Sequence, residues 1–163
     1  MRPPAVSVIT VCRNAKTDLL KTQESVYSQD FPDFEWIVID GSSSDGTLDL
    51  LNGITDSRVK WISEPDTGIY DAMNKGLRMA TGIRVWFLNA GDLFFDSRSL
   101  GKVAKAPDAV EVCFGESVVE DSSGTILGTR SEITPHTTPK KLYKAKFKEG
   151  MIVSHQAFIP LRK

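Results

Sequence analysis

Three loops rich in acidic and small polar residues occur in the first part of the chain. They are DGSSSDG at residues 40–46, EPDTG at residues 64–68 and NAGD at residues 89–92. Their carboxylates could hold a divalent cation together with phosphate oxygens, because Mg²⁺ and Mn²⁺ prefer oxygen ligands. A carboxylate such as that of Asp40 could also accept a hydrogen bond from the imide N–H of uracil or from a ribose hydroxyl. Taken singly, each loop fits ordinary turn chemistry, since Asp, Gly and Ser form turns and helix caps.

Each of these loops directly follows an apolar stretch that is rich in strand-forming residues. Strands are predicted at residues 5–12, 35–39, 58–62 and 84–88. Apolar residues at helical spacing predict a helix through residues 19–27, with Thr17 or Asp18 as its N-cap. A short helix is predicted through residues 48–51. A longer one is predicted over residues 69–80, and Gly82 is expected to end it.

Strands and helices that alternate in this way predict an α/β fold of the Rossmann-like type, with a mostly parallel central sheet and helices on both faces. The carboxyl ends of parallel strands meet at one edge of the sheet, where ligands bind. The three loops together therefore favour a ligand site. After residue 107 the pattern changes to strands at 110–114, 117–119 and 125–127 around a turn at 121–124. We expect one domain over 1–163, made of an α/β part at 1–107 and a β-rich extension at 108–163.

The composition excludes several classes of protein. Twenty Lys and Arg against 21 Asp and Glu give a net charge of −1, without the basic excess of a nucleic-acid-binding protein. Apolar runs are too short to span a bilayer and no signal peptide is evident, so a cytoplasmic protein is predicted. Cys12 and Cys113 lack metal-ligand spacing. A buried, reduced thiol is expected for each, and a reactive Cys12 is the alternative.

Four blocks of sequence resemble the bacterial family 2 glycosyltransferases in order and spacing. They are SVITVCRN at 7–14, IDGSSSDGT at 39–47, ISEPDTGIYDAMNKG at 62–76 and FLNAGD at 87–92. The segments ATG at 80–82 and SHQAF at 154–158 resemble shorter elements of the same family. The resemblance implies an inverting transferase with the GT-A fold, in which residues 1–107 bind a nucleotide-sugar and residues 108–163 form part of the acceptor side.

The resemblance also implies roles for individual residues. Thr10, Val11, Arg13 and Asn14 would hold the base and ribose, and Asp40 would pair with uracil or its equivalent. Asp66, Gly68 and Asn74 would line the nucleotide-sugar cleft. Asp92 matches the last aspartate of the metal-binding DxD element and would hold Mg²⁺ or Mn²⁺. His155 would lie near the diphosphate or the acceptor.

The chain departs from the family pattern at three points. Many members have a second aspartate where this chain has Gly41, and the DxD element is reduced to NAGD, with one carboxylate. The family places its general base downstream of the element at 154–158, and no residue of this chain matches it. We therefore expect the amino-terminal part of a longer enzyme, or a degenerate gene product.

The predicted function is transfer of a sugar from a UDP- or GDP-sugar to a hydroxyl of a saccharide or lipid-linked acceptor, in the synthesis of cell-surface polysaccharide, lipopolysaccharide or glycolipid. A nucleotide-sugar-binding module without efficient turnover is the alternative. A dinucleotide-dependent oxidoreductase is disfavoured, because the turn after the first strand contains no glycine. The basic run Lys140–Lys148 predicts either a solvated amphipathic segment or contact with anionic lipid at the inner face of the membrane. Apolar sheet surface left uncovered would favour self-association.

Overall fold

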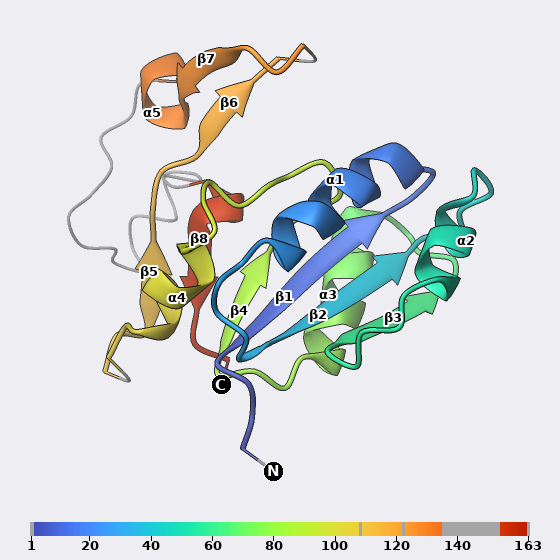
Figure 1. The fold of residues 1–163 in the computed structure, drawn as a ribbon, viewed down its shortest axis with the longest axis horizontal. Coiled ribbons are helices and arrows are strands. Elements are labelled where there is room, and N and C mark those ends of the chain that lie inside the picture. Colours follow the sequence, from blue (N-terminus) through green and yellow to red (C-terminus); the bar gives the residue numbers. More distant parts are fainter. Residues whose placement is uncertain (1, 108, 122, 135–153, 163) are drawn as a thin grey trace.

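The computed structural model describes residues 2–107, 109–121, 123–134 and 154–162 and has the expected α/β fold. Its central sheet has four parallel strands in the order β3-β2-β1-β4 (Figure 1). The strands are β1 (Val6–Cys12), β2 (Phe34–Asp40), β3 (Val59–Ser63) and β4 (Arg84–Phe87). All four predicted strands are confirmed, and their ends differ from the prediction by only one residue.

Helices cover both faces of this sheet. Figure 1 shows α1 (Lys16–Tyr27) on the near face and α3 (Ile69–Met79) on the far face. Alternate residues of β1 point to the two sides: Val8 packs with Leu19 of α1, whereas Ile9 packs with Ala72 of α3. Two short helices, α2 (Thr47–Asn52) and α4 (Ser99–Ala104), pack on the same face as α1. A sheet buried on both faces explains why its strands are almost continuously apolar.

Two predictions about helix ends are wrong. Helix α1 begins at Lys16 and has no local side-chain cap. Its first N–H instead donates to Oδ2 of Asp45 at 3.0 Å, from a loop that is distant in sequence. Helix α3 ends at Met79 without a left-handed glycine. Gly82 serves close packing, because a Cβ there would lie 2.5 Å from the backbone nitrogen of Ser7 in β1.

The later part of the chain is β-rich, as predicted. Strands β6 (Val118–Glu120) and β7 (Ile126–Thr129) form the expected antiparallel hairpin, followed by the short helix α5 (Arg130–Ile133). Strand β5 (Val112–Phe114) pairs with β8 (Phe158–Pro160), which follows the 3₁₀ turn η2 (His155–Ala157). Neither β8 nor α4 was predicted. The division of the domain at residue 107 stays a prediction.

Strand β8 carries the end of the chain back to the central sheet. Leu161 bridges to Arg84 at the start of β4. The same strand brings η2 to the other end of β4, where Trp86 Nε1 donates to the carbonyl of Gln156 at 2.6 Å. None of the helices in the described part of the chain is long and apolar enough to cross a membrane.

The amino edge of the sheet holds a buried carboxylate, that of Glu35. It accepts hydrogen bonds from Lys60 Nζ (2.8 Å), Ser7 Oγ (2.7 Å), the N–H and hydroxyl of Thr81 (2.6 and 2.9 Å) and the N–H of Gly82 (3.1 Å). Burial raises the pKa of Glu35, but these hydrogen bonds outweigh it and lower the pKa to about 2. Glu35 is therefore ionised and joins β1, β3 and the turn before β4.

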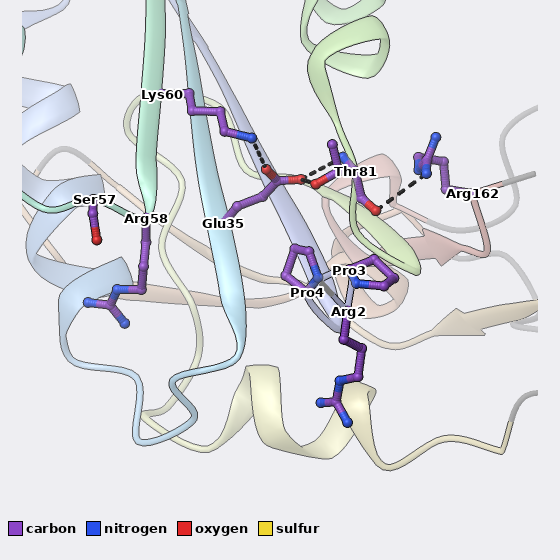
Figure 2. A pocket seen from close by; sticks show the side chains of 9 residues that line it. All are labelled: Arg2, Pro3, Pro4, Glu35, Ser57, Arg58, Lys60, Thr81 and Arg162. Atoms are coloured by element: carbon purple, nitrogen blue, oxygen red, sulfur yellow. Dashed lines mark hydrogen bonds and ion pairs between the residues drawn. The ribbon is translucent and has the colours of Figure 1, made fainter.

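A groove of about 500 Å³ opens beside Glu35 (Figure 2). Three of its cations already have acidic partners: Arg2 pairs with Asp33, Arg58 with Asp56, and Lys60 with Glu35. Its fourth cation, Arg162, donates to the carbonyls of Thr81 and Gly82. All four cations of the groove thus have partners within the protein, and these contacts hold the segments at the amino edge of the sheet together.

Candidate functional site

The structure brings the three polar loops together at the carboxyl edge of the sheet, with the loop after β1 between them. Asn14 joins the loop after β1 to the loop after β2: its N–H donates to Ser43 Oγ at 2.7 Å, and its Oδ1 accepts from the N–H of Ser44 at 2.8 Å. The N–H of Glu64 donates to the carbonyl of Asp40 at 3.0 Å, and that of Ala90 to the carbonyl of Val11 at 3.2 Å. We call this edge the rim.

Three of the residues proposed to hold the nucleotide lie inside the sheet. Thr10 is fully buried, and its hydroxyl donates to the carbonyl of Leu88 at 2.7 Å and accepts from Trp36 Nε1 at 2.9 Å. Val11 is also buried. Asp40 has no exposed surface. These side chains hold the rim in shape and offer a ligand almost no surface.

The carboxylate of Asp40 is satisfied by neighbouring loops. Its Oδ2 accepts from the N–H of Ser43 at 2.9 Å and from the hydroxyl of Ser63 at 2.6 Å, and the hydroxyl of Ser43 donates to Oδ1. The Cys12 thiol lies 3.7 Å from the same Oδ1. Burial, with the adjacent Asp40 charge, raises the pKa of Cys12 to about 12, so this cysteine is an unreactive thiol.

The loop between β3 and α3 is held firmly. Lys75 of α3 donates to the carbonyl of Pro65 at 2.6 Å and pairs with Glu64 at 2.9 Å. The paired Glu64 carboxylate raises the pKa of Lys75, so the ammonium stays charged. Within the loop, the N–H of Gly68 donates to Oδ1 of Asp66 at 2.9 Å. Gly68 and Asn74 are exposed, and Asp66 is half-buried.

Gly41 lies directly beneath two side chains from neighbouring loops. A Cβ at this position would lie 2.4 Å from Oδ2 of Asp66 and 3.3 Å from Cδ of Arg13. Asp66 and Arg13 therefore meet at the rim over Gly41, although they are far apart in sequence. Arg13 is exposed, so this part of the rim faces solvent.

Asp92 occupies the other side of the rim, after β4. Burial raises the pKa of its carboxyl group, while the N–H of Asn89 (3.2 Å to Oδ2), the His155 ring and Gln156 oppose that effect in part. Thr22 of α1 fixes the backbone around it, because its hydroxyl donates to the carbonyl of Asp92 at 3.0 Å and accepts from the N–H of Gly91 at 2.9 Å. The carboxylate is thus preplaced in a site of reduced polarity.

Asn89 has an unmet hydrogen-bonding group beside Asp92. Its Nδ2 lies 3.3 Å from Nε2 of His155. Its Oδ1 is buried and has no hydrogen-bond partner among the described residues. A buried carbonyl oxygen without a partner is costly unless a ligand satisfies it. His155, which the sequence placed near the diphosphate or acceptor, thus contacts the NAGD loop.

The residues of the rim fit a divalent cation only if the ligand supplies part of the coordination. No group of three or more His, Cys, Asp and Glu side chains suited to a metal occurs in the described ranges. The Asp92 carboxylate and the orphaned Asn89 Oδ1 are oxygen donors of the kind that Mg²⁺ and Mn²⁺ prefer. A diphosphate could provide further oxygens.

Sequence reasoning missed Asn89, Gln156 and Thr22. The position of Asn89 at a strand end was a usable signal, whereas the contacts of Gln156 and Thr22 depend on how β8 and α1 pack. The basic run Lys140–Lys148 lies outside the described residues.

Comparison with known proteins identifies the family. The model of "Glycosyl transferase family 2" matches residues 7–163. The uncharacterized glycosyltransferase Rv1514c of Mycobacterium tuberculosis is 35% identical over 156 residues, which cover 94% of this chain and 57% of the relative. The Escherichia coli UDP-Glc:alpha-D-GlcNAc-diphosphoundecaprenol beta-1,3-glucosyltransferase WfaP is 35% identical over 94 residues, or 57% of this chain and 38% of WfaP.

A solved structure supports the same assignment. The mannosyltransferase PcManGT from Pyrobaculum calidifontis, in complex with GDP-Man and Mn²⁺, matches with a TM-score of 0.61 and 26% identity, covering 74% of this chain and 36% of that chain. This chain spans little more than half the length of the mycobacterial relative. The expected GT-A fold is confirmed, and the chain belongs to glycosyl transferase family 2.

Proposed function

We propose that this chain binds a UDP- or GDP-sugar along the rim, with Mg²⁺ or Mn²⁺ at Asp92, and takes part in transfer of the sugar to a hydroxyl acceptor. The observation that carries the proposal lies in the loop 89–92 at the carboxyl edge of a family 2 sheet: the Asp92 carboxylate accepts from the Asn89 N–H, and the Asn89 Oδ1 in the same loop has no hydrogen-bond partner among the described residues. Two oxygen donors that the described part of the chain leaves incompletely satisfied suit a hard cation. PcManGT, which carries GDP-Man and Mn²⁺, supports this choice of ligand and metal.

A bound cation would neutralise charge on the leaving diphosphate, an effect worth roughly several kcal/mol in metal sites. The chain's own groups hold that region in place: Thr22 fixes the backbone at Asp92, and His155 fixes the amide of Asn89. His155 is exposed at this point, so it could also contact the diphosphate or the acceptor.

The nucleoside would lie over the other loops of the rim. Arg13, Asp66, Gly68 and Asn74 present exposed or half-buried surface there. Thr10, Val11 and Asp40 are buried beneath these loops and support them. The exposed Asn14 ties the loop after β1 to the loop after β2. We therefore assign Asp40 a positioning role, in place of the direct pairing with uracil that the resemblance implied.

The reaction would be inverting. An acceptor hydroxyl oxygen attacks the anomeric carbon, the bond from that carbon to the diphosphate oxygen breaks, and the acceptor proton passes to a general base. No residue is assigned as that base. WfaP is named for a lipid-diphosphate-linked acceptor, which supports a saccharide or lipid-linked acceptor here. Such an acceptor would suit synthesis of envelope polysaccharide at the cytoplasmic side of the membrane.

A second candidate is binding of the nucleotide-sugar without efficient transfer. The mycobacterial relative is much longer than this chain, and a positioned base typically contributes about 10²–10⁴-fold in rate. Donor turnover with acceptor should be compared between this chain and a form extended to the length of the relative. Equal turnover in the two would exclude this candidate.

The test of the proposed function is calorimetric titration of UDP and GDP with and without Mn²⁺. The unsubstituted chain should bind one of them, and Mn²⁺ should tighten binding by about 10–100-fold. Asp92→Ala should abolish the gain from Mn²⁺ and leave the melting temperature near that of the parent. Asp49→Ala, on the exposed side of α2, is the matched control and should keep the gain. The same Mn²⁺ dependence in Asp92→Ala would refute the assignment.

A further inference from the structure

The part of the rim opposite Asp92 contains a carboxylate whose position the proposed function does not explain. Asp66 comes from the loop after β3, yet its Oδ2 stands over Gly41 in the loop after β2. The crowding is severe, because a Cβ on residue 41 would lie 2.4 Å from that oxygen. Position 41 has no side chain of its own, and the carboxylate of Asp66 fills the space that such a side chain would need.

Asp66 is held in this position by its loop. Ser63 at the end of β3 and the N–H of Glu64 both bond to Asp40, directly before Gly41. Lys75 donates to the carbonyl of Pro65 from the other side. The N–H of Gly68 then fixes Oδ1 of Asp66 at 2.9 Å. The backbone on both sides of Asp66 is thus anchored, so the direction of its carboxylate is set before any ligand binds.

The carboxylate retains capacity to accept hydrogen bonds. An ionised carboxylate offers about four lone-pair sites, and among the described residues only the N–H of Gly68 donates to Asp66. Unlike Asp40, which is fully buried and bonded to Ser43 and Ser63, Asp66 is half-buried and reaches the solvent side of the rim. It can therefore take a hydrogen bond directly from a ligand.

The position along the sheet indicates which part of a ligand would reach it. Asp66 follows β3 and Asp92 follows β4, the two outer strands of the order β3-β2-β1-β4. Three strand spacings separate these strands, or about 14 Å, a span comparable with that of an extended nucleoside diphosphate. In the proposed function a cation at Asp92 holds the diphosphate, whereas the Asp66 carboxylate has no such cation and disfavours phosphate, so the nucleoside would lie at Asp66.

We infer that Asp66 determines nucleotide specificity: its carboxylate, standing in for a side chain at position 41, accepts a hydrogen bond from an N–H of the base or an O–H of the ribose. This inference rests on the proposed function. The side chain of Arg13, from the loop after β1, also lies against Gly41 and borders the same part of the rim. A carboxylate aimed at the ring nitrogen of the pairing edge favours uracil and guanine, whose ring N–H donates, over cytosine, whose ring nitrogen accepts and whose donor on that edge is the exocyclic amino group.

The test moves the carboxylate from position 66 to position 41 and measures nucleotide affinity by calorimetry in the presence of Mn²⁺. Asp66→Ala should weaken binding of the preferred nucleotide about tenfold or more, as expected for one lost charge-assisted hydrogen bond. Gly41→Asp alone should also weaken binding, because the new carboxylate meets Asp66. The double variant Gly41→Asp/Asp66→Ala should recover most of the lost affinity. Asp49→Ala is the control for loss of one surface carboxylate and should bind as the parent does.

Asp66→Asn tests the chemistry with the least change of shape, and it serves if the double variant does not fold. Its amide can still accept from Gly68 while donating to an acceptor on a base. If the base is the partner, Asp66→Asn should bind CDP better relative to UDP than the parent does. If the ribose is the partner, the ratio of CDP to UDP should stay constant, and the parent should instead discriminate against 2′-deoxy-UDP.

The outcomes separate the inference from the proposed function. If the parent chain binds no nucleotide, the proposed function fails and the inference with it. If the parent binds and Asp66→Ala binds equally well, only the inference is overturned. A double variant that folds but remains as weak as Asp66→Ala would refute the equivalence of the two positions.

Discussion

The amino and carboxyl edges of the central sheet each hold a buried carboxylate of β2. Only the carboxyl edge has in addition the loop that contains Asn89 and Asp92. At the amino edge Glu35 accepts five hydrogen bonds, which lower its pKa to about 2. At the carboxyl edge Asp40 is also buried and well bonded, but burial raises the pKa of Asp92, and the Oδ1 of Asn89 has no partner in the ranges that the structure describes. Burial of an acid therefore does not mark a site in this protein. Unmet hydrogen-bonding capacity alone does not mark one either, because the buried Nη1 of Arg84 at the amino edge also lacks a partner among the described residues. What distinguishes the carboxyl edge is an unmet oxygen acceptor in the same loop as an acid whose pKa burial raises.

Glu35 should give the largest effect on stability and none on ligand affinity. Its folded-state pKa of about 2, against an ordinary 4.5, makes the ionised form worth about 3 kcal/mol. Glu35→Gln should lower the free energy of unfolding by about this amount at neutral pH, measured by urea denaturation. Because the folded pKa is depressed, the contribution is present above pH 4.5 and is lost as the pH falls toward 2. A Glu35→Gln protein of unchanged stability would contradict the structural role of this edge.

Asp40 should give a smaller loss of stability together with a loss of affinity. Asp40→Ala leaves the N–H and hydroxyl of Ser43 and the hydroxyl of Ser63 without their acceptor, at a cost of about 1–3 kcal/mol. The loops that Asp40 joins should loosen, so nucleotide binding should weaken as well. Urea denaturation and calorimetry measure the two effects. Weaker binding at unchanged stability would instead indicate that Asp40 contacts the ligand directly.

The pH dependence of metal-assisted binding separates Asp92 from Glu35. Mn²⁺ requires the ionised carboxylate, and burial raises the pKa of Asp92, so protons compete with the metal at a higher pH than for an ordinary aspartate. Because burial raises the pKa of Asp92, its ionised form destabilises the folded state and protonation removes that cost. On mild acidification the fold should therefore persist while the Mn²⁺-dependent gain in nucleotide affinity declines. Calorimetry over a series of mildly acidic pH values tests this. If the Mn²⁺-dependent gain in affinity persists down to the pH at which protonation of Glu35 unfolds the chain, Asp92 is not the metal ligand.

Asn89 should give the smallest effect. Asn89→Asp adds a second carboxylate beside Asp92 and should tighten Mn²⁺-dependent nucleotide binding by about two- to tenfold, since cation affinity follows the charge of the ligands. Asn89→Ala, which removes the orphaned oxygen, should weaken it by a similar factor. Calorimetry of both variants in the presence and absence of Mn²⁺ gives the comparison. Identical metal dependence in both would exclude Asn89 as a ligand.

The fold and the carboxyl edge were accessible from the sequence, whereas the role of Glu35 at the amino edge was not. Continuous β-branched runs predicted that β1 and β2 are buried between helices on both faces of the sheet. The ends of the predicted strands indicated that Asp40, Asp66 and Asp92 lie at the same edge. Short elements were missed: α4 has six residues, and β8 has three and pairs with β5 across a long separation. The prediction of Thr17 or Asp18 as the N-cap of α1 was wrong, because Asp45 accepts from the first N–H of this helix through a contact that is distant in sequence.

The roles of single residues depended on side-chain direction, which spacing does not give. Asp40 and Asp66 both follow strands, yet Ser43 and Ser63 enclose the first while the second stands over Gly41. The absence of a side chain at Gly41 was visible in the sequence as a departure from the family pattern. Its consequence, that a neighbouring loop fills the space, required the structure.

Hydrogen–deuterium exchange of the chain with and without a GDP- or UDP-sugar and Mn²⁺ tests the central claim most directly, because it compares both edges of the sheet in one experiment. The ligand should slow exchange in the loops after all four strands, at residues 12–15, 41–46, 64–68 and 89–92. Exchange at the amino edge, around Glu35, Lys60 and Thr81, should not change beyond the general stabilisation of the fold. Protection confined to the amino edge, or none at the rim under saturating ligand, would contradict the account.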